Sequence, residues 1–161
     1  MNDRIYLYDT TLRDGAQTEG VSFSLEDKLE IVSRLDSFGM DFIEGGMPSS
    51  NPKDLELFTN KVPELKKSEF VAFGSTCRPN TEADKDENLK SLASCRSEWT
   101  CIFGKSWDFH VTEALGTTLE ENLRMIRDSI AFLKENGKKV IFDAEHFFDG
   151  YRSNEKYAMD V

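Results

Sequence analysis

The sequence predicts an α/β fold built on a parallel sheet. Short apolar runs rich in β-branched and aromatic residues recur along the chain, and longer segments with helical periodicity separate them. Most of these apolar runs are followed directly by polar residues or glycine. Regular alternation of strands and helices is typical of parallel sheets that are joined by right-handed crossovers.

Five strands are expected, each a short run bounded by turn residues. The first run alternates in side-chain type and stops at Asp9, and three later runs end directly before a glycine. The runs are residues 5–8, 42–44, 70–73, 99–103 and 140–142. The predicted order along the chain is therefore β-α-β-α-β-α-β-α-β.

The first two helices have recognisable ends. Ser24, with Asp27 three residues later, has the pattern of a capping box, and the helix that it opens stops at Gly39. Asn51-Pro52 supplies a cap and a first-turn proline for a helix that reaches about Lys61. These signals place one helix after each of the first two strands.

The later helices are predicted from signals of unequal strength. Residues 87–95 form a weakly amphipathic segment. Thr118 and Glu121 have the pattern of a second capping box, ahead of the most regular helix in the chain, which stops at Gly137. A fifth helix is expected to start at Tyr151.

Composition indicates a soluble globular protein of one domain. The 161 residues include 30 acidic and 20 basic side chains, which give a net charge of −10. An acidic surface argues against nucleic-acid and anionic-membrane partners, and no apolar stretch approaches the roughly 20 residues that span a bilayer. Three cysteines without CxxC spacing, and a start without a signal-peptide pattern, favour the cytoplasm and buried thiols.

Chemistry is expected at the carboxyl ends of the strands, where parallel α/β folds form their sites. The segments that follow the strands are residues 9–17, 44–49, 74–78, 104–110 and 143–150. In the first of these, Arg13 and Asp14 suit a divalent metal that the acid binds and a developing oxyanion that the guanidinium stabilises. An isolated Arg-Asp-Gly tripeptide is more often a turn with a surface ion pair.

Three further side chains in these segments have open interpretations. Glu145, at the end of the fifth strand, suits a general acid or base, and it equally suits a solvated loop acid. His110 and His146 are the only histidines, and without a shared short spacing they indicate zinc only weakly. Each histidine equally suits a hydrogen-bonded structural role.

Residues 8–17, YDTTLRDGAQ, resemble the signature of the metal-dependent acyl-CoA condensing and lyase family, whose members are TIM barrels. The family includes isopropylmalate, homocitrate and citramalate synthases and hydroxymethylglutaryl-CoA lyase. Further similar segments are residues 43–54, 72–76, 102–108, 110–115 and 143–151. Together they resemble the citramalate synthase branch most, and the resemblance covers essentially the whole chain.

The resemblance implies a fold and a reaction. The α/β units would be the first five strands of an eight-stranded parallel (β/α) barrel, so residues 1–161 would be the N-terminal part of one incomplete barrel, with no second domain. The family reaction is a Claisen-type condensation of acetyl-CoA with a small 2-oxo acid. For the citramalate branch the 2-oxo acid is pyruvate, and the product enters isoleucine biosynthesis; the sister enzyme serves leucine biosynthesis. A divalent metal (Mg, Mn or Zn) and a homo-oligomer of the full-length enzyme are also expected.

The resemblance also assigns site residues. Asp14 would be a metal ligand, and Arg13 would contact the substrate and stabilise negative charge on its oxygen. Glu145 would be a catalytic carboxylate, with Gln17 and His110 as substrate contacts. The family completes its metal centre with a His-x-His pair, and this sequence contains no such pair. The isolated chain is therefore expected to be inactive.

Three alternatives stay open on sequence grounds. The first is a lyase of the same superfamily, which cleaves an acyl-CoA instead of forming a carbon–carbon bond. The second is a non-catalytic fragment that works only after assembly with a separately made second half. The third is a complete doubly wound domain that shares the signature by chance, which the number of similar segments disfavours.

Overall fold

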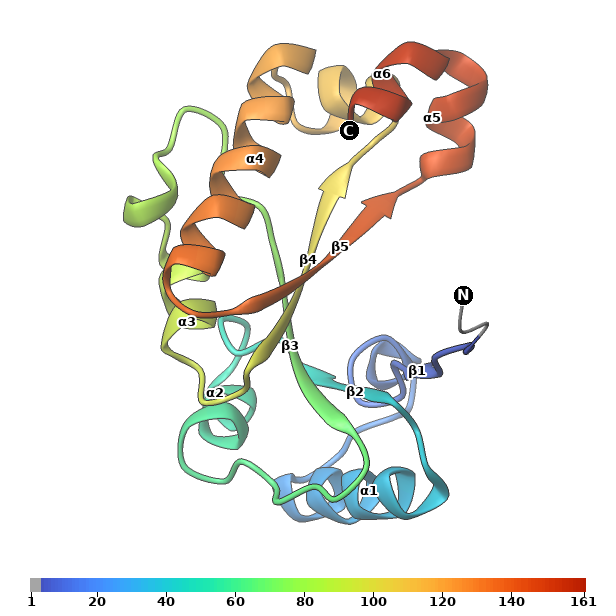
Figure 1. Ribbon diagram of the computed structural model, residues 1–161, viewed down its shortest axis with the longest axis vertical. Coiled ribbons are helices and arrows are strands. Elements are labelled where there is room, and N and C mark those ends of the chain that lie inside the picture. Colours follow the sequence, from blue (N-terminus) through green and yellow to red (C-terminus); the bar gives the residue numbers. More distant parts are fainter. Residues whose placement is uncertain (1–3) are drawn as a thin grey trace. The chain divides into compact units, whose positions relative to one another are not determined.

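The computed structural model describes residues 4–161 and shows five strands that alternate with helices (Figure 1). The strands are β1 (Tyr8–Asp9), β2 (Phe42–Gly46), β3 (Glu69–Ser75), β4 (Trp99–Lys105) and β5 (Lys139–Glu145). They run parallel, and hydrogen bonding orders them β1-β2-β3-β4-β5. Each strand thus lies beside the one before it in sequence, which confirms the predicted α/β fold of successive parallel β-α units.

Helices connect the strands and follow the last one. They are α1 (Leu25–Phe38), α2 (Pro52–Thr59), α3 (Glu87–Ser94), α4 (Leu119–Glu135), α5 (Phe147–Ser153) and α6 (Glu155–Asp160). Short 3₁₀ turns cover Gly15–Gln17 and Ala83–Lys85, and a π-helical turn covers His110–Ala114. None of the helices between residues 4 and 161 has the length and apolar character needed to cross a membrane.

The chain packs as two compact units. The first unit contains the residues up to Phe73 together with Ser94–Thr100, and the second contains Gly74–Ala93 and Cys101–Val161. Each unit has its own buried apolar residues, and each holds part of the predicted site.

In the first unit, α1 and β2 are held by the local signals that predicted them. The Ser24 hydroxyl accepts a hydrogen bond from the Asp27 amide, and the Asp27 carboxylate accepts one from the Ser24 amide. Gly39 ends α1 with φ of +99°, a conformation that suits glycine. Gly45 leaves room for the stacked rings of Phe58 and Phe70, because a Cβ at this position would lie 2.2 Å from the Phe70 ring.

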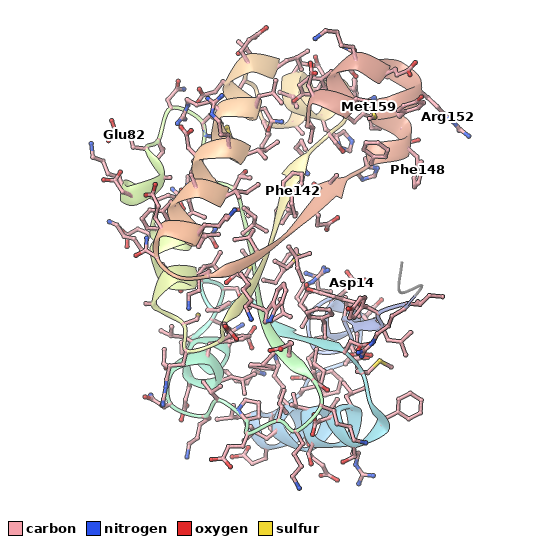
Figure 2. All side chains as sticks on the ribbon, in the orientation of Figure 1. Asp14, Glu82, Phe142, Phe148, Arg152 and Met159 are labelled. Carbon is pink, nitrogen blue, oxygen red and sulfur yellow. The ribbon has the colours of Figure 1, made fainter. Side chains whose placement is uncertain are left out.

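In the second unit, two glycines allow close packing around β4. A Cβ on Gly104 would lie 3.0 Å from the ring of Phe142, which Figure 2 labels on β5. A Cβ on Gly150 would lie 2.2 Å from the Ser106 carbonyl oxygen, so α5 approaches the segment after β4 at backbone distance. The apolar core of this unit includes Leu89, Leu92, Ile102, Val111, Met125, Ile126 and Leu133, all of them buried.

Two predicted boundaries are wrong. The strand predicted at residues 5–8 is confined to β1, because the ladder with β2 begins at the Tyr8–Phe42 pair. The helix predicted from Tyr151 begins earlier, at Phe147, and is interrupted at Asn154. Asn154 adopts an extended φ of −147°, and its side chain accepts a hydrogen bond from the Tyr157 amide, so it caps a separate helix.

Of two other expectations, one is confirmed and one is met only in part. The three cysteines are buried, as expected. The second capping box forms only in part: the Thr118 hydroxyl accepts from the Glu121 amide at 3.1 Å, but the Glu121 carboxylate bonds Arg124 and the Asn80 amide instead. The charged Arg124 side chain has thus replaced the Thr118 amide as a partner of the Glu121 carboxylate.

Candidate functional site

The loop after β1 is built around a tight turn that carries Arg13. The Thr10 carbonyl accepts hydrogen bonds from the amides of Arg13 and Gly15, both at 3.1 Å. The Asp9 carboxylate accepts from the Thr11 amide at 3.0 Å, which fixes the entry to the turn. This part of the loop is therefore ordered by its own short-range hydrogen bonds.

The Arg13 guanidinium is fixed by three side chains of the first unit. Its Nε donates to the buried carboxylate of Glu44, and its Nη1 donates to Asp14 at 3.1 Å. The guanidinium also lies over the ring of Phe73, 4.0 Å from the centroid. Glu44, whose side chain is 1% exposed, accepts a second hydrogen bond from the Tyr8 hydroxyl at 2.6 Å.

Glu44 is a residue that sequence reasoning did not single out. It lies within residues 44–49, a segment expected to follow a strand, but the sequence assigns it no catalytic or binding role. The available signal was a carboxylate between an apolar run and two glycines, and in the structure Glu44 lies in the middle of β2. Its burial beside Arg13 makes it a partner that orients the guanidinium, because a buried carboxylate is stable only when it is paired and hydrogen-bonded.

Asp14 differs from its neighbour by its exposure. Its side chain is 66% exposed and projects from the loop after β1 (Figure 2). A carboxylate oxygen suits a hard divalent cation. Within residues 4–161, however, no three His, Cys, Asp or Glu side chains are grouped so as to hold a metal ion. Asp14 therefore suits one ligand of a metal centre, and the other described residues do not complete such a centre.

A cleft of about 270 Å³ opens beside this loop in the first unit. Arg13 and Gln17 line it, together with Lys28, Lys53, Asp54 and Phe73. The first unit thus brings together three of the predicted site residues, Arg13, Asp14 and Gln17, on one short loop. Basic and amide side chains in such a cleft suit an anionic organic ligand.

The second unit holds Glu145 at the end of β5. Its carboxylate, one-third exposed, forms an ion pair with Lys105 at the end of β4. Its backbone carbonyl accepts from the amide and the hydroxyl of Ser106, at 3.2 and 2.6 Å. Glu145 is therefore anchored by its main chain and held by a cation at its side chain, which suits a group that exchanges protons at a fixed place.

His110 lies in an aromatic group of the second unit. Its ring centroid is 4.7 Å from that of Trp107 and 4.6 Å from that of His146. Its Nδ1 is buried and has no hydrogen-bond partner among the described residues. His110 begins the π-helical turn, a conformation that is frequent at functional sites. The structure thus places His110 in the segment after β4 and Glu145 at the end of the neighbouring strand β5.

Comparison with known proteins identifies the sequence relatives of this chain. Residues 4–158 match the family described as HMGL-like. The chain is 55% identical to the (R)-citramalate synthase of Aquifex aeolicus, over 100% of this chain and 31% of that protein. It is 55% identical to the (R)-citramalate synthase of Synechocystis sp., over 96% of this chain and 28% of that protein. The chain spans about a third of the length of these curated relatives.

More distant relatives and solved structures agree with this result. A probable 2-isopropylmalate synthase of Methanopyrus kandleri is 30% identical, over 100% of this chain and 30% of that protein. The HMG-CoA lyase of Brucella melitensis superposes with a TM-score of 0.63 at 16% identity, covering 86% of this chain and 47% of the lyase. At that identity the likeness shows the fold alone, and it supports the prediction of partial-barrel β-α units.

Proposed function

Because this chain belongs to the HMGL-like family, we propose that it carries part of the active site of an enzyme that condenses acetyl-CoA with a 2-oxo acid. Pyruvate is the proposed 2-oxo acid, and citramalate is the product. The observation that carries the proposal is the 55% identity to (R)-citramalate synthases over at least 96% of the chain. The reaction would make the enzyme an acyltransferase of isoleucine biosynthesis in the cytoplasm, acting as a homo-oligomer.

Arg13 is the proposed electrostatic catalyst. When a carbon nucleophile attacks a ketone, negative charge develops on the ketone oxygen. A guanidinium that is already oriented stabilises this charge without reorganisation in the transition state. Glu44 and Phe73 hold Arg13 beside the cleft, and this arrangement supports the assignment. Gln17, which also lines the cleft, is the proposed contact for the 2-oxo acid.

Asp14 is proposed as one ligand of a divalent metal. Its exposed carboxylate has the donor chemistry that Mg²⁺ and Mn²⁺ prefer and that Zn²⁺ accepts. The metal, when bound, would polarise the ketone and hold the 2-oxo acid in place. Catalytic zinc centres use about three protein ligands, whereas residues 4–161 offer no cluster of three. We therefore propose that the isolated 161-residue chain is inactive.

Glu145 and His110 are proposed to act from the second unit. The Glu145 carboxylate would accept or donate a proton, and its ion pair with Lys105 would hold the carboxylate in place. His110 would contact the substrate through a ring that Trp107 and His146 hold in place. Both assignments rest on the family resemblance and on the positions of His110 after β4 and of Glu145 at the end of β5.

Since the isolated 161-residue chain is proposed to be inactive, the direct test is release of CoA by the full-length enzyme, which is called the native protein below. Acetyl-CoA, pyruvate and Mg²⁺ or Mn²⁺ are incubated with the protein, and free thiol is measured, with a branched 2-oxo acid and no 2-oxo acid as parallel reactions. Thiol release that depends on pyruvate is expected. Release only with the branched acid would assign an isopropylmalate-type reaction instead. No release with any 2-oxo acid, combined with cleavage of hydroxymethylglutaryl-CoA, would show a lyase and overturn the proposal.

A further inference from the structure

Lys28 of α1 and Asp54 of α2 form an ion pair that is almost completely buried in the first unit. Their side chains are 4% and 7% exposed, and the Nζ–Oδ1 distance is 2.6 Å. Burying two charges removes their hydration, and apolar residues of similar volume are often as stabilising as such a pair. The pair is therefore a poor device for stability alone, and its contacts indicate what else it does.

The Lys28 ammonium uses all three of its donors on defined acceptors. One goes to Asp54, one to the Gly45 carbonyl at 3.0 Å, and one to the Leu12 carbonyl at 3.2 Å. The two carbonyls belong to different segments, the loop after β1 and the end of β2. A single buried cation thus ties two strand ends together.

These two carbonyls flank the Arg13–Glu44 ion pair in the sequence. Leu12 directly precedes Arg13, and Gly45 directly follows Glu44. The ammonium therefore holds the backbone next to each member of the pair. A displacement of either backbone segment would change the position of the guanidinium relative to its carboxylate.

Asp54 holds the same region from the side of α2. Its Oδ2 accepts from the Met47 amide at 3.0 Å, and its own amide donates to the Asn51 side chain at 2.8 Å. Gly46 has a φ of +139°, and a Cβ there would lie 2.5 Å from Asp54 Oδ2 and 2.9 Å from Lys28 Nζ. The backbone after β2 thus runs close against the buried pair.

We propose that Lys28 and Asp54 are positioning residues that set the place of Arg13 relative to Glu44. Both residues line the cleft, but the three donors of Lys28 are used on Leu12, Gly45 and Asp54, so we propose that the pair acts through the backbone of Leu12 and Gly45. The catalytic consequence rests on the function proposed for Arg13, whereas the geometric consequence does not. The two can therefore be tested separately.

The geometric test follows the Arg13 Nε–H group by NMR in native protein labelled with ¹⁵N-arginine. Its resonance is assigned from its loss in the Arg13→Lys variant. The test variant is Lys28→Met with Asp54→Leu, which replaces the pair by apolar side chains of similar size. We expect a shifted Nε–H resonance that exchanges faster with water, because its bond to Glu44 is no longer held. The matched control, Glu30→Gln with Arg34→Met, removes an exposed pair on the same helix and should leave the resonance unchanged.

The kinetic test measures condensation of acetyl-CoA with pyruvate by the same variants. A misplaced catalytic group can cost about 100-fold in rate, so we expect kcat/KM of the double variant to fall by about 10- to 100-fold. The loss should appear in kcat, and the thermal midpoint should fall as well, because the Met47 amide and the Gly45 and Leu12 carbonyls lose their partners. A general loss of structure would instead abolish the cooperative thermal transition.

Several results would overturn the inference. The clearest is a folded double variant with the wild-type Arg13 resonance. If that variant does not fold, Asp54→Asn takes its place. This substitution keeps the side-chain volume and removes the charge, and the Arg13 Nε–H resonance is measured in the same way. Failure of both variants to fold would also contradict the inference, because the pair would then be needed for the whole unit. If the native protein condenses no 2-oxo acid, the proposed function fails, while the resonance still decides the geometric claim.

Discussion

Glu44 and Arg13 form an ion pair that joins β2 to the loop after β1. Glu44 is the buried member, and the Tyr8 hydroxyl donates to its second oxygen. Both carboxylate oxygens therefore have a donor, which a buried charge requires. The relationship makes the orientation of Arg13 depend on residues that do not face the cleft.

Removal of the Tyr8 hydroxyl should destabilise the protein. Tyr8→Phe leaves one oxygen of a buried carboxylate without its donor, and a buried unsatisfied group costs about 1–3 kcal/mol. Urea denaturation should show this loss in the free energy of unfolding. Tyr6→Phe is the matched control, because Tyr6 is exposed, and it should change little. Equal effects of the two substitutions would contradict the role of the Tyr8–Glu44 bond.

Asp36 should make stability depend on pH. Burial raises the pKa of Asp36, but hydrogen bonds from the backbone amides of Lys67, Lys66 and Ser68 together outweigh it and hold the pKa below its ordinary value. A lowered folded-state pKa means that the ionised carboxylate stabilises the protein above its unfolded pKa of about 3.9. That contribution is lost as the pH falls through the folded-state pKa.

The Asp36→Asn variant provides the comparison. Its free energy of unfolding at pH 7 should be lower than that of the wild type, and the difference should shrink as the pH is lowered below about 4. Urea titrations at each pH measure both curves. A difference that stays constant over this range would show that the Asp36 carboxylate does not contribute through its charge.

Gly45 should tolerate no side chain. A Cβ at this position would overlap the buried, stacked rings of Phe70 and Phe58, and overpacking of a core costs about 1–3 kcal/mol. Gly15→Ala is the control, since a Cβ there would meet its nearest atom at an ordinary 3.8 Å. Thermal unfolding of Gly45→Ala and Gly15→Ala should therefore give clearly different midpoints. A Gly45→Ala midpoint at the wild-type value would refute the packing argument.

Asp14→Asn should weaken metal binding by the native protein. Loss of an outer-shell partner of a metal ligand costs about 10- to 100-fold in affinity, and loss of the ligand itself should cost at least as much. Titration with Mn²⁺, followed by electron paramagnetic resonance, gives the dissociation constants. Asp84→Asn removes an exposed carboxylate of the second unit and serves as the control. Equal affinities for both variants would remove Asp14 from the metal centre.

The sequence predicted those features that depend on neighbouring residues. The Ser24 capping box, the Asn51 cap and the glycine at the end of α1 all formed, because each is satisfied within one turn of chain. The parallel β-α order followed from the alternation of patterns. Arg13, Asp14 and Gln17 could be placed together because they share a short loop, and Arg13 and Gln17 both line the cleft beside it.

Features that depend on distant residues were not predictable in the same way. Lys28 lies in a helix rich in charged residues, and nothing local separates it from a solvated lysine. Its burial follows from Asp54, which is 26 residues away. Glu121 was predicted to close a capping box, but Arg124 and the Asn80 amide compete for its carboxylate and lower its pKa to about 2. Partners that are distant in the sequence determine the burial of Lys28 and the hydrogen bonds of Glu121, and the periodicity of the sequence does not indicate such partners.

The kinetics of Arg13→Lys in the native protein test the central claim most directly. Lysine keeps the positive charge but loses the planar fork that bonds Glu44 and faces the cleft. We predict that kcat for condensation of acetyl-CoA with pyruvate falls by about 100- to 1,000-fold, as on removal of an oxyanion donor, in a variant that still unfolds in one cooperative thermal transition. A folded variant with the wild-type kcat would show that Arg13 does not stabilise the transition state and would contradict the account.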